Sequence, residues 1–239
     1  MVRKLGTTSV LVAVTALASA CGGSSNGAAN DNPLVGSTPS SQVSSSASVP
    51  GGADCGPKPT KPAQAEHYQA EPKVTVAPTT YTATVVTNCG TIVASLDAAK
   101  APHTVNSFAF LSAHHFFDNT PCHRLTTAGI YVLQCGDPTG TGSGGPGYTI
   151  PDENLKGATY PAGTLAMANT GQPHTGGSQF FFCYADTQLP PQYTPFGHVT
   201  QGLDVLQGIA KNGEDDSNQP GDGHPNKPVY ILSFTVTKG

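Results

Sequence analysis

The stretch Thr164–Phe182, with the sequence TLAMANTGQPHTGGSQFFF, decides the fold that we expect for this chain. It begins with a short apolar alternation in which Leu165 and Met167 share one face of a strand. A segment rich in Gly, Pro, Asn and Thr follows at 169–177, and this composition excludes both helix and regular strand. Three consecutive phenylalanines end the stretch and predict a second strand with aromatic side chains on both faces.

A strand–loop–strand unit of this kind is suited to form the wall of a shallow apolar groove. An ordinary hairpin of a protein core has the same pattern, so other stretches must separate the two interpretations. Three blocks do so: CHRL at 122–125 with GIYVLQCGDPTG at 129–140, MAN with GSQFFF at 167–182, and PFGHV at 195–199. Taken in this order and spacing, the blocks resemble the cyclophilin family of peptidyl-prolyl isomerases, from about Thr80 to the C-terminus.

The pattern of apolar residues agrees with the fold that this resemblance implies. Alternating or apolar runs predict eight strands, at 81–87, 91–96, 121–126, 131–135, 164–168, 179–184, 196–199 and 229–237. Pro102 begins a helix with Val105, Phe108 and Leu111 on its apolar face, and 202–210 forms a second helix. We therefore expect a mainly β protein, a closed eight-stranded antiparallel barrel capped by two α-helices.

Composition narrows the class of protein. Only 11% of the 239 residues are charged, whereas Gly and Pro are abundant at 28 and 21 residues. This balance is typical of a turn-rich β protein with a flexible segment. The net charge is −4 and no basic run is present, so nucleic acid is not an expected partner.

The N-terminus predicts export. Arg3 and Lys4 precede an apolar run over 10–20 that is too short to span a bilayer as a mature helix. The run ends in Ala20-Cys21, which resembles a bacterial lipoprotein signal with Cys21 as the lipidated residue. A plain secretory signal with Ala-Ser-Ala as its cleavage site is the alternative. The first predicts a protein anchored by lipid on the extracytoplasmic face of the cell membrane, and the second a secreted protein.

We divide the chain into three parts. Residues 1–20 form the signal peptide, 21–72 the lipidated cysteine with a Ser/Gly/Pro-rich tether, and 73–239 the folded isomerase-like domain. The tether has few aromatic or β-branched residues and is expected to be disordered, because it cannot bury enough apolar surface to fold.

Five further cysteines follow the lipidation signal: Cys55, Cys89, Cys122, Cys135 and Cys183. Disulfides persist outside the cytoplasm, and an odd number leaves at least one thiol unpaired. Cys122 and Cys135 lie on neighbouring predicted strands, but alternation counted from Arg124 and Gln134 places them on opposite faces. The pairing remains open.

The chemistry implied by the resemblance needs neither nucleophile nor metal. Rotation about the bond before proline has a barrier of about 18–20 kcal/mol, maintained by amide resonance. In the twisted amide the proline nitrogen regains a lone pair, and a fixed guanidinium that donates to it lowers the barrier. Arg124 matches the arginine of the family's His-Arg motif, and Gln134 matches the glutamine that positions it. A structural arginine paired with a carboxylate is the alternative role for Arg124.

The resemblance also assigns the groove that would hold the substrate. The proline pocket is expected from Tyr131, Val132, Phe181 and Leu189, with Ala168 and Asn169 along the groove. The adjoining subsite is expected from Thr170, Gly171 and Gln179. Tyr193 stands where the family has a histidine, and Gln188 where it has the tryptophan associated with tight binding of cyclosporin. Since the chain has no Trp, we expect weak sensitivity to that drug.

Three other motifs are set aside, and neither cofactor nor metal is expected. The glycines of 140–145 match a dinucleotide-binding pattern, but Pro146 stands where the helix of that motif should begin. Ser178 lacks the second glycine of a nucleophile elbow. His114, His115 and His123 have no carboxylate cluster nearby in sequence.

Two functions from different classes remain. The first is an exported, monomeric peptidyl-prolyl cis-trans isomerase that acts on X-Pro segments of unfolded or exported proteins. The second is a non-catalytic proline-peptide binding module or holdase chaperone. Arg124 favours the first, since binding needs only the pocket whereas lowering the barrier needs the donor.

Overall fold

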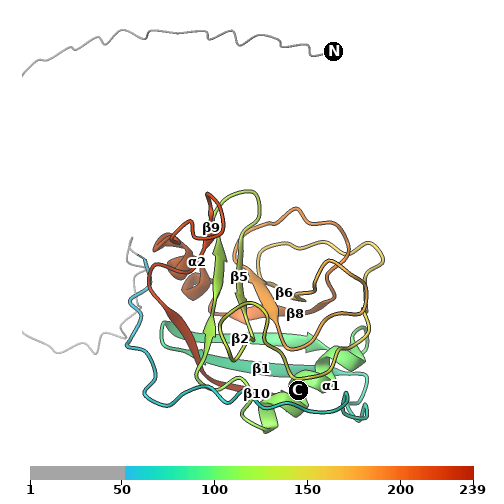
Figure 1. The fold of residues 1–239 in the computed structure, drawn as a ribbon. Coiled ribbons are helices and arrows are strands. Elements are labelled where there is room, and N and C mark those ends of the chain that lie inside the picture. The colour runs from blue at the N-terminus through green and yellow to red at the C-terminus, as the bar shows by residue number, and fades with distance from the viewer. Residues whose placement is uncertain (1–51) are drawn as a thin grey trace, which may run out of the picture. The chain divides into compact units, whose positions relative to one another are not determined.

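The computed structural model describes residues 52–239, so the signal peptide, Cys21 and most of the expected tether lie outside the described residues. Figure 1 shows a curled antiparallel sheet with α2 at its upper left and α1 at its lower right. The helices are α1 (Pro102–Ala113) and α2 (Leu203–Lys211). The strands are β1 (Thr80–Thr87), β2 (Gly90–Asp97), β3 (Thr120–Cys122), β4 (Arg124–Thr126), β5 (Val132–Cys135), β6 (Thr164–Met167), β7 (Phe180–Cys183), β8 (Pro195–Gln201), β9 (Asp222–Gly223) and β10 (Val229–Lys238).

The sheet corrects the expected closed eight-stranded barrel. In the described residues it has ten strands in the order β3-β10-β1-β2-β8-β6-β7-β5-β4-β9, and this hydrogen-bonded order does not close on itself. Two changes account for the difference. The run predicted at 121–126 is divided into β3 and β4, and β9 adds two residues that no periodicity marked.

His123 stands at the division between β3 and β4. Before it, Cys122 pairs with Val229 of β10; after it, Arg124 pairs with Gln134 of β5. The two short strands are thus consecutive in the chain but lie far apart in the sheet order. Side chains on β3 and β4 therefore do not follow one continuous alternation between the two faces of the sheet, and an assignment of faces that continues through His123 is wrong.

The core is centred on the ring of Phe108 in α1. Its centroid lies 4.7 Å from that of Phe196 in β8 and 5.3 Å from that of Phe180 in β7. Phe117 and Phe234 lie at 5.2 and 5.7 Å. Stacked, tilted and edge-on ring pairs at these distances add to the stabilisation from apolar burial. One helix therefore ties together strands that are distant in sequence.

The β6–β7 hairpin has the form predicted from the opening stretch. Leu165 pairs with Phe182 and Met167 with Phe180, and all four side chains enter the main core. Phe181, between them, enters a separate apolar cluster on the other face of the sheet. Alternation along β7 thus gives the hairpin one side in the core and one side available for a groove.

The N-terminus of α1 is capped from a distance. Ala101 at the cap position has no side chain that can accept a hydrogen bond. The carboxylate of Glu153 instead accepts hydrogen bonds from the backbone N–H groups of His103 and Thr104 at 3.0 and 2.9 Å. A negative charge at this end also interacts favourably with the helix dipole. Neither α1 nor α2 has the length and hydropathy needed to cross a membrane.

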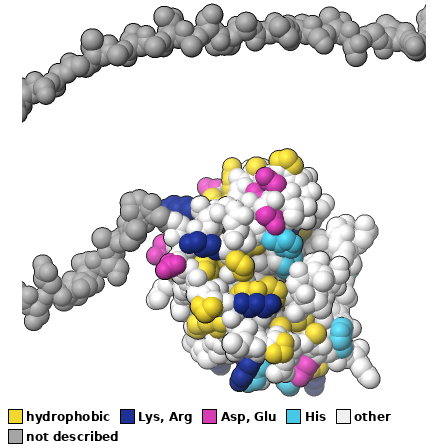
Figure 2. Space-filling model, turned by 60° about the vertical axis from the view of Figure 1, so that its left-hand side comes forward, with side chains coloured by type: hydrophobic (Ala, Val, Ile, Leu, Met, Phe, Trp, Pro, Cys, Tyr) yellow, Lys and Arg dark blue, Asp and Glu magenta, His cyan; other side chains and the backbone are white. Residues whose placement is uncertain are grey.

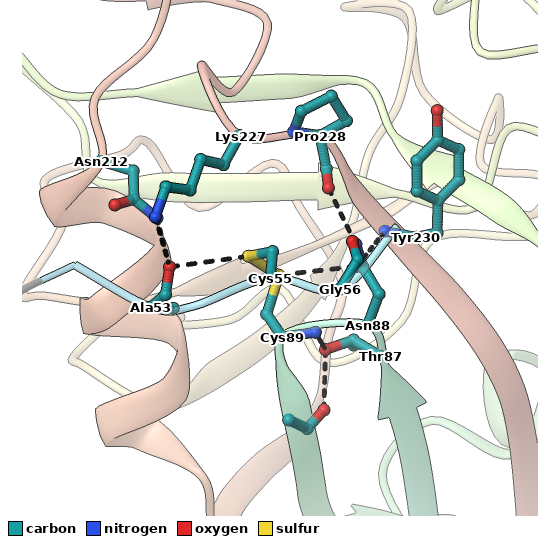
Figure 3. The surroundings of a disulfide bond; sticks show 11 residues. Ala53, Cys55, Gly56, Thr87, Asn88, Cys89, Asn212, Lys227, Pro228 and Tyr230 are labelled. Atoms are coloured by element: carbon teal, nitrogen blue, oxygen red, sulfur yellow. Dashed lines mark hydrogen bonds between the residues drawn. A yellow bond between two sulfur atoms is a disulfide. The ribbon is translucent and has the colours of Figure 1, made fainter. Parts of the chain in front are cut away.

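The described part of the expected tether lies against the domain. Cys55 forms a disulfide with Cys89 in the β1–β2 turn, and the backbone N–H of Gly56 donates to the carbonyl of Asn88 at 2.7 Å (Figure 3). For residues 52–72 the structure therefore differs from the disordered segment that composition predicts. The disulfide and the hydrogen bonds to the domain replace the apolar burial that this segment lacks.

The second disulfide joins Cys122 of β3 to Cys135 of β5. Alternation placed these residues on opposite faces, and the interruption at His123 explains the error. Cys183 is the free cysteine of the described residues and is buried, in agreement with the odd count.

On the face seen in Figure 2, Lys and Arg side chains stand singly among apolar and uncharged surface.

Candidate active site

Arg124 and Gln134 lie directly opposite each other on β4 and β5. Nη1 of Arg124 donates a hydrogen bond to Oε1 of Gln134, with a nitrogen–oxygen distance of 3.3 Å. The Arg124 side chain is 34% exposed, so it is only partly covered by the rest of the domain. The structure thus brings together the two residues that the sequence assigned to catalysis.

Asp222 is a further member of the site that the sequence did not reveal. It lies on β9, which pairs with the free side of β4. Its carboxylate accepts hydrogen bonds from Nε of Arg124 at 2.9 Å and from Nη2 at 2.6 Å. Asn218 donates a further hydrogen bond to the same carboxylate at 3.0 Å. This fork-to-fork geometry fixes the plane of the guanidinium.

The ion pair shifts both ionisation equilibria. The hydrogen bond to Asp222 raises the pKa of Arg124, and the same bond lowers the pKa of Asp222. Both groups therefore stay charged at neutral pH. Of the five N–H donors of a guanidinium, two are used by Asp222 and one by Gln134. The other two N–H groups have no partner among residues 52–239.

Gln134 connects the arginine to the glycine-rich loop. Its Nε2 donates to Oε1 of Gln179 at 2.9 Å. Gln179 in turn donates from Nε2 to the carbonyl oxygens of Gly142 and Gly144, each at 2.9 Å. A row of side-chain amides thus fixes the rotamer of Gln134, and through it one edge of the guanidinium.

A buried carboxylate orders the loop itself. Asp137 accepts hydrogen bonds from the backbone N–H groups of Thr139, Gly142 and Gly144 at 2.7, 2.7 and 3.0 Å. Burial acts to raise the pKa of Asp137, but these hydrogen bonds together with that of the Thr139 hydroxyl outweigh it, and the pKa is lowered. Because a carboxylate of the chain occupies these N–H groups, the loop is not arranged to bind the phosphates of a dinucleotide.

A small apolar cluster lies on the same face of the sheet as Arg124, because Arg124 pairs with Gln134 and Gln134 pairs with Phe181. Three of the four residues expected for the proline pocket, Val132, Phe181 and Leu189, gather there with Tyr193, Ala166 and Ala168. The rings of Phe181 and Tyr193 meet edge to face, with centroids 5.6 Å apart. Tyr160, which no periodicity marked, donates its hydroxyl to the carbonyl of Tyr193 at 2.8 Å and holds that segment in place.

Two predicted residues lie elsewhere. Tyr131 packs against the main core, with its ring 5.9 Å from that of Tyr184, because it faces away from its neighbour Val132. Gly171 lines a separate cavity of about 390 Å³ with Gln172, His174 and Asp152. The remaining predicted residues, Ala168, Asn169, Thr170 and Gln179, line one cavity together with Gln134.

That cavity has a volume of about 800 Å³ and adjoins the arginine through Gln134. Its walls are the glycine-rich loop over 142–149, the loop after β6, and His67 from the N-terminal segment. Gln188 instead borders a cavity of about 210 Å³ with Leu189 and Tyr160. No group of three potential metal-ligating side chains occurs within residues 52–239. Burial lowers the pKa of His123, so this imidazole is neutral at pH 7.

Comparison with known proteins shows the family. The family model for cyclophilin-type peptidyl-prolyl cis-trans isomerases matches residues 82–236. A protein named probable peptidyl-prolyl cis-trans isomerase B from Mycobacterium leprae is 45% identical over 212 residues, which cover 83% of this chain and 69% of the relative. A protein of the same name from Mycobacterium tuberculosis is 42% identical over 201 residues, covering 77% of this chain and 64% of the relative.

Comparison with solved structures gives the same family. The crystal structure of a Cryptosporidium parvum cyclophilin-type peptidyl-prolyl cis-trans isomerase superposes with a TM-score of 0.59 at 27% identity, covering 67% of this chain and 99% of the other. A second structure of that protein, in the presence of the dipeptide Ala-Pro, gives a TM-score of 0.58 at 28% identity, covering 66% of this chain and 99% of the other. The chain belongs to the cyclophilin-type peptidyl-prolyl cis-trans isomerases, enzymes of the EC 5.2.1.8 type. It spans about two thirds of the length of the mycobacterial relatives.

Proposed function

We propose that this chain isomerises X-Pro bonds of exported proteins and that Arg124 supplies the barrier-lowering hydrogen bond. The observation that carries the proposal is the position of its guanidinium. Asp222 and Gln134 hold it on two sides, and the strand register places Arg124, Gln134 and Phe181 in a row on one face of the sheet. Two N–H groups stay free for the substrate.

The reaction requires the proline ring to be held while the preceding carbonyl turns. The apolar cluster provides hydrophobic side chains for this purpose, with Phe181 and Val132 buried and Leu189 partly exposed. As the amide twists, conjugation is lost and the lone pair returns to the proline nitrogen. A guanidinium fixed in advance donates to this lone pair more strongly than to the planar amide, so it stabilises the transition state selectively.

Isomerase assays on the full chain test this proposal. The wild type should accelerate cis-to-trans conversion of a short X-Pro peptide, which takes tens to hundreds of seconds without catalyst. Arg124→Ala should reduce kcat/KM at least tenfold, or about 1.4 kcal/mol of barrier. If neither protein accelerates the reaction although both bind the peptide, the chain is a binding module or holdase.

The proposed site of action is outside the cytoplasm. Both disulfides, Cys55–Cys89 and Cys122–Cys135, fit an oxidising compartment. We further propose that Cys21 carries the lipid that retains the monomeric protein at the membrane. In the host cell, Cys21→Ser should move the protein from the membrane fraction to the medium. Unchanged membrane retention would contradict the anchor, and intracellular accumulation of the wild type would contradict export.

A further inference from the structure

Residues 52–79, here called the N-terminal strap, contact the rest of the domain at both ends and in the middle. In Figure 1 this segment runs from near α2 to near α1. At its start, the N–H of Ala53 donates to the carbonyl of Gly208 in α2 at 2.8 Å. The carbonyl of Ala53 accepts a hydrogen bond from the side-chain amide of Asn212 at 2.9 Å (Figure 3). The Cys55–Cys89 disulfide follows two residues later.

The far end of the strap is fastened to α1. The carboxylate of Glu71 lies 2.7 Å from Nδ1 of His103. The side-chain amide of Asn106 donates to the carbonyls of Pro72 and Lys73, each at 3.2 Å, and its oxygen accepts from the N–H of Thr75 at 2.9 Å. Asn106 is buried, so these bonds are shielded from competing water.

Between these ends, Tyr68 fixes the strap against the glycine-rich loop. Its N–H donates to the carbonyl of Pro146 at 2.7 Å, and its ring packs edge to face on Phe110 with centroids 4.9 Å apart. The neighbouring residue is Gly147, which has a φ of 91°, and a Cβ at this position would lie 2.7 Å from the carbonyl oxygen of Tyr68. Only glycine permits this close approach.

The consequence is that His67 enters the wall of the 800 Å³ cavity. It lines this cavity together with Gln134 and Gln179, the residues that link the cavity to Arg124. Among the described residues, no Asp, Glu, Lys or Arg lines this cavity. His67 therefore brings to the substrate groove a ring nitrogen that the domain of residues 80–239 does not provide.

The other side-chain amides that line the cavity are already engaged as donors: Gln179 uses both of its N–H groups, and Gln134 and Asn169 each use one of two. The amide of Gln134 donates to Gln179, that of Gln179 to the glycine-rich loop, and that of Asn169 to the carbonyl of Gln192 at 2.8 Å. Within residues 52–239 the His67 ring makes no hydrogen bond, and it is exposed to the cavity. An imidazole offers at least one N–H in either protonation state.

We propose that His67 is a specificity-determining residue that contacts the substrate side chain flanking the X-Pro pair. The side chains that it favours carry an acceptor oxygen, as in Gln, Asn, Glu and Asp, over apolar side chains of the same size. This inference rests on the proposed isomerase function. It assigns to the N-terminal strap a part of the substrate site.

The test uses the full chain and two series of short peptides. One series places Gln or Leu immediately before an Ala-Pro pair, and the other places them immediately after it. In the series whose variable residue enters the cavity, we expect the wild type to prefer Gln at least threefold in kcat/KM. His67→Ala should bring this ratio to about one, and His67→Gln, which keeps an N–H donor, should restore it. His115→Ala, an exposed histidine that does not line the cavity, is the matched control and should keep the wild-type ratio.

An unchanged Gln-to-Leu ratio in His67→Ala would overturn the inference, even if the rates for all peptides fell together. If the wild type accelerates no peptide, the proposed isomerase function fails separately. In that case the dissociation constants of the Gln and Leu peptides, measured by NMR titration, decide the role of His67. Equal ratios of these constants for wild type and His67→Ala would then refute it.

Discussion

Nε and Nη2 of Arg124 donate to the two carboxylate oxygens of Asp222 at 2.9 and 2.6 Å, although 98 residues separate the two positions in the chain. The pair is half-enclosed, with the Asp222 side chain only 8% exposed. A structural arginine paired with a carboxylate and a catalytic arginine were alternatives from the sequence. The structure shows the ion pair with the carboxylate, which uses one edge of the guanidinium and leaves donors on the other edge, as the proposed catalytic role requires.

This pairing makes Asp222 a positioning residue with a measurable effect. Asp222→Ala should lower kcat by about tenfold, equivalent to about 1.4 kcal/mol, while KM changes little, because the proline cluster is untouched. Asp204→Asn, an exposed carboxylate in the first turn of α2, is the control and should leave both constants unchanged. A rise in KM at constant kcat would show that Asp222 serves binding rather than the orientation of Arg124.

The ion pair between Arg124 and Asp222 predicts part of the decrease in the free energy of unfolding at acidic pH. Arg124 lowers the pKa of Asp222 below the value of about 3.9 expected in the unfolded chain. Since the unfolded chain binds this proton more readily, the contribution to stability is complete above that value and disappears as the pH falls through the folded pKa. Urea unfolding from pH 6 to pH 2 should therefore show a shallower acid decline for Asp222→Asn than for the wild type. Parallel curves would contradict the assignment.

The Cys122–Cys135 disulfide lies next to the proposed catalytic pair, since Arg124 is two residues from Cys122 and Gln134 is one residue from Cys135. Replacing both cysteines by serine removes a cross-link over a sequence separation of 13 residues. The free energy of unfolding should fall by about 3 kcal/mol. At a temperature where the variant stays folded, kcat should fall several-fold, because β3 and β5 are no longer tied.

Replacing Cys55 and Cys89 by serine provides the comparison for that double variant. It should also reduce stability, but with a smaller effect on kcat, because this disulfide lies in the β1–β2 turn. Equal losses of kcat from both double variants would indicate a general loss of structure rather than loosening of the Arg124–Gln134 pair.

Cys183 should be an inert thiol in the folded protein. Burial raises its pKa to about 12, and the side chain has no exposed surface. The thiolate that reacts with alkylating reagents is therefore almost absent at pH 8. Labelling of Cys183 with iodoacetamide should be undetectable in buffer and complete in urea. The urea concentration at half-maximal labelling should equal the midpoint of the unfolding transition. Rapid labelling of the native protein would show that the cluster around Phe181 opens readily.

Local pattern predicted the parts of the fold where side-chain periodicity is strong. The phenylalanines of β7 alternate between the core and the groove as expected, and Arg124 faces Gln134 because both lie on short paired strands. Asp222 could not be found in this way. It lies in a turn-rich segment without periodicity, and only the pairing of β9 with β4 brings it to the arginine.

The N-terminal strap was missed for a different reason. Its composition predicts disorder because it has little apolar surface of its own, yet it binds through backbone hydrogen bonds, one disulfide and the ring of Tyr68. The only local signals were an aromatic residue and a cysteine in a segment otherwise rich in Pro and Ala. Both depend on partners in the domain, and sequence alone does not identify them.

The most direct test of the central claim separates binding from catalysis in one sample. NMR exchange spectroscopy on an X-Pro peptide gives both its dissociation constant and its rate of cis–trans exchange on the protein. For Arg124→Ala we predict a dissociation constant within about threefold of the wild type and an exchange rate at least tenfold lower, about 1.4 kcal/mol. Exchange at the wild-type rate on the bound Arg124→Ala protein would contradict the role of Arg124 as the donor.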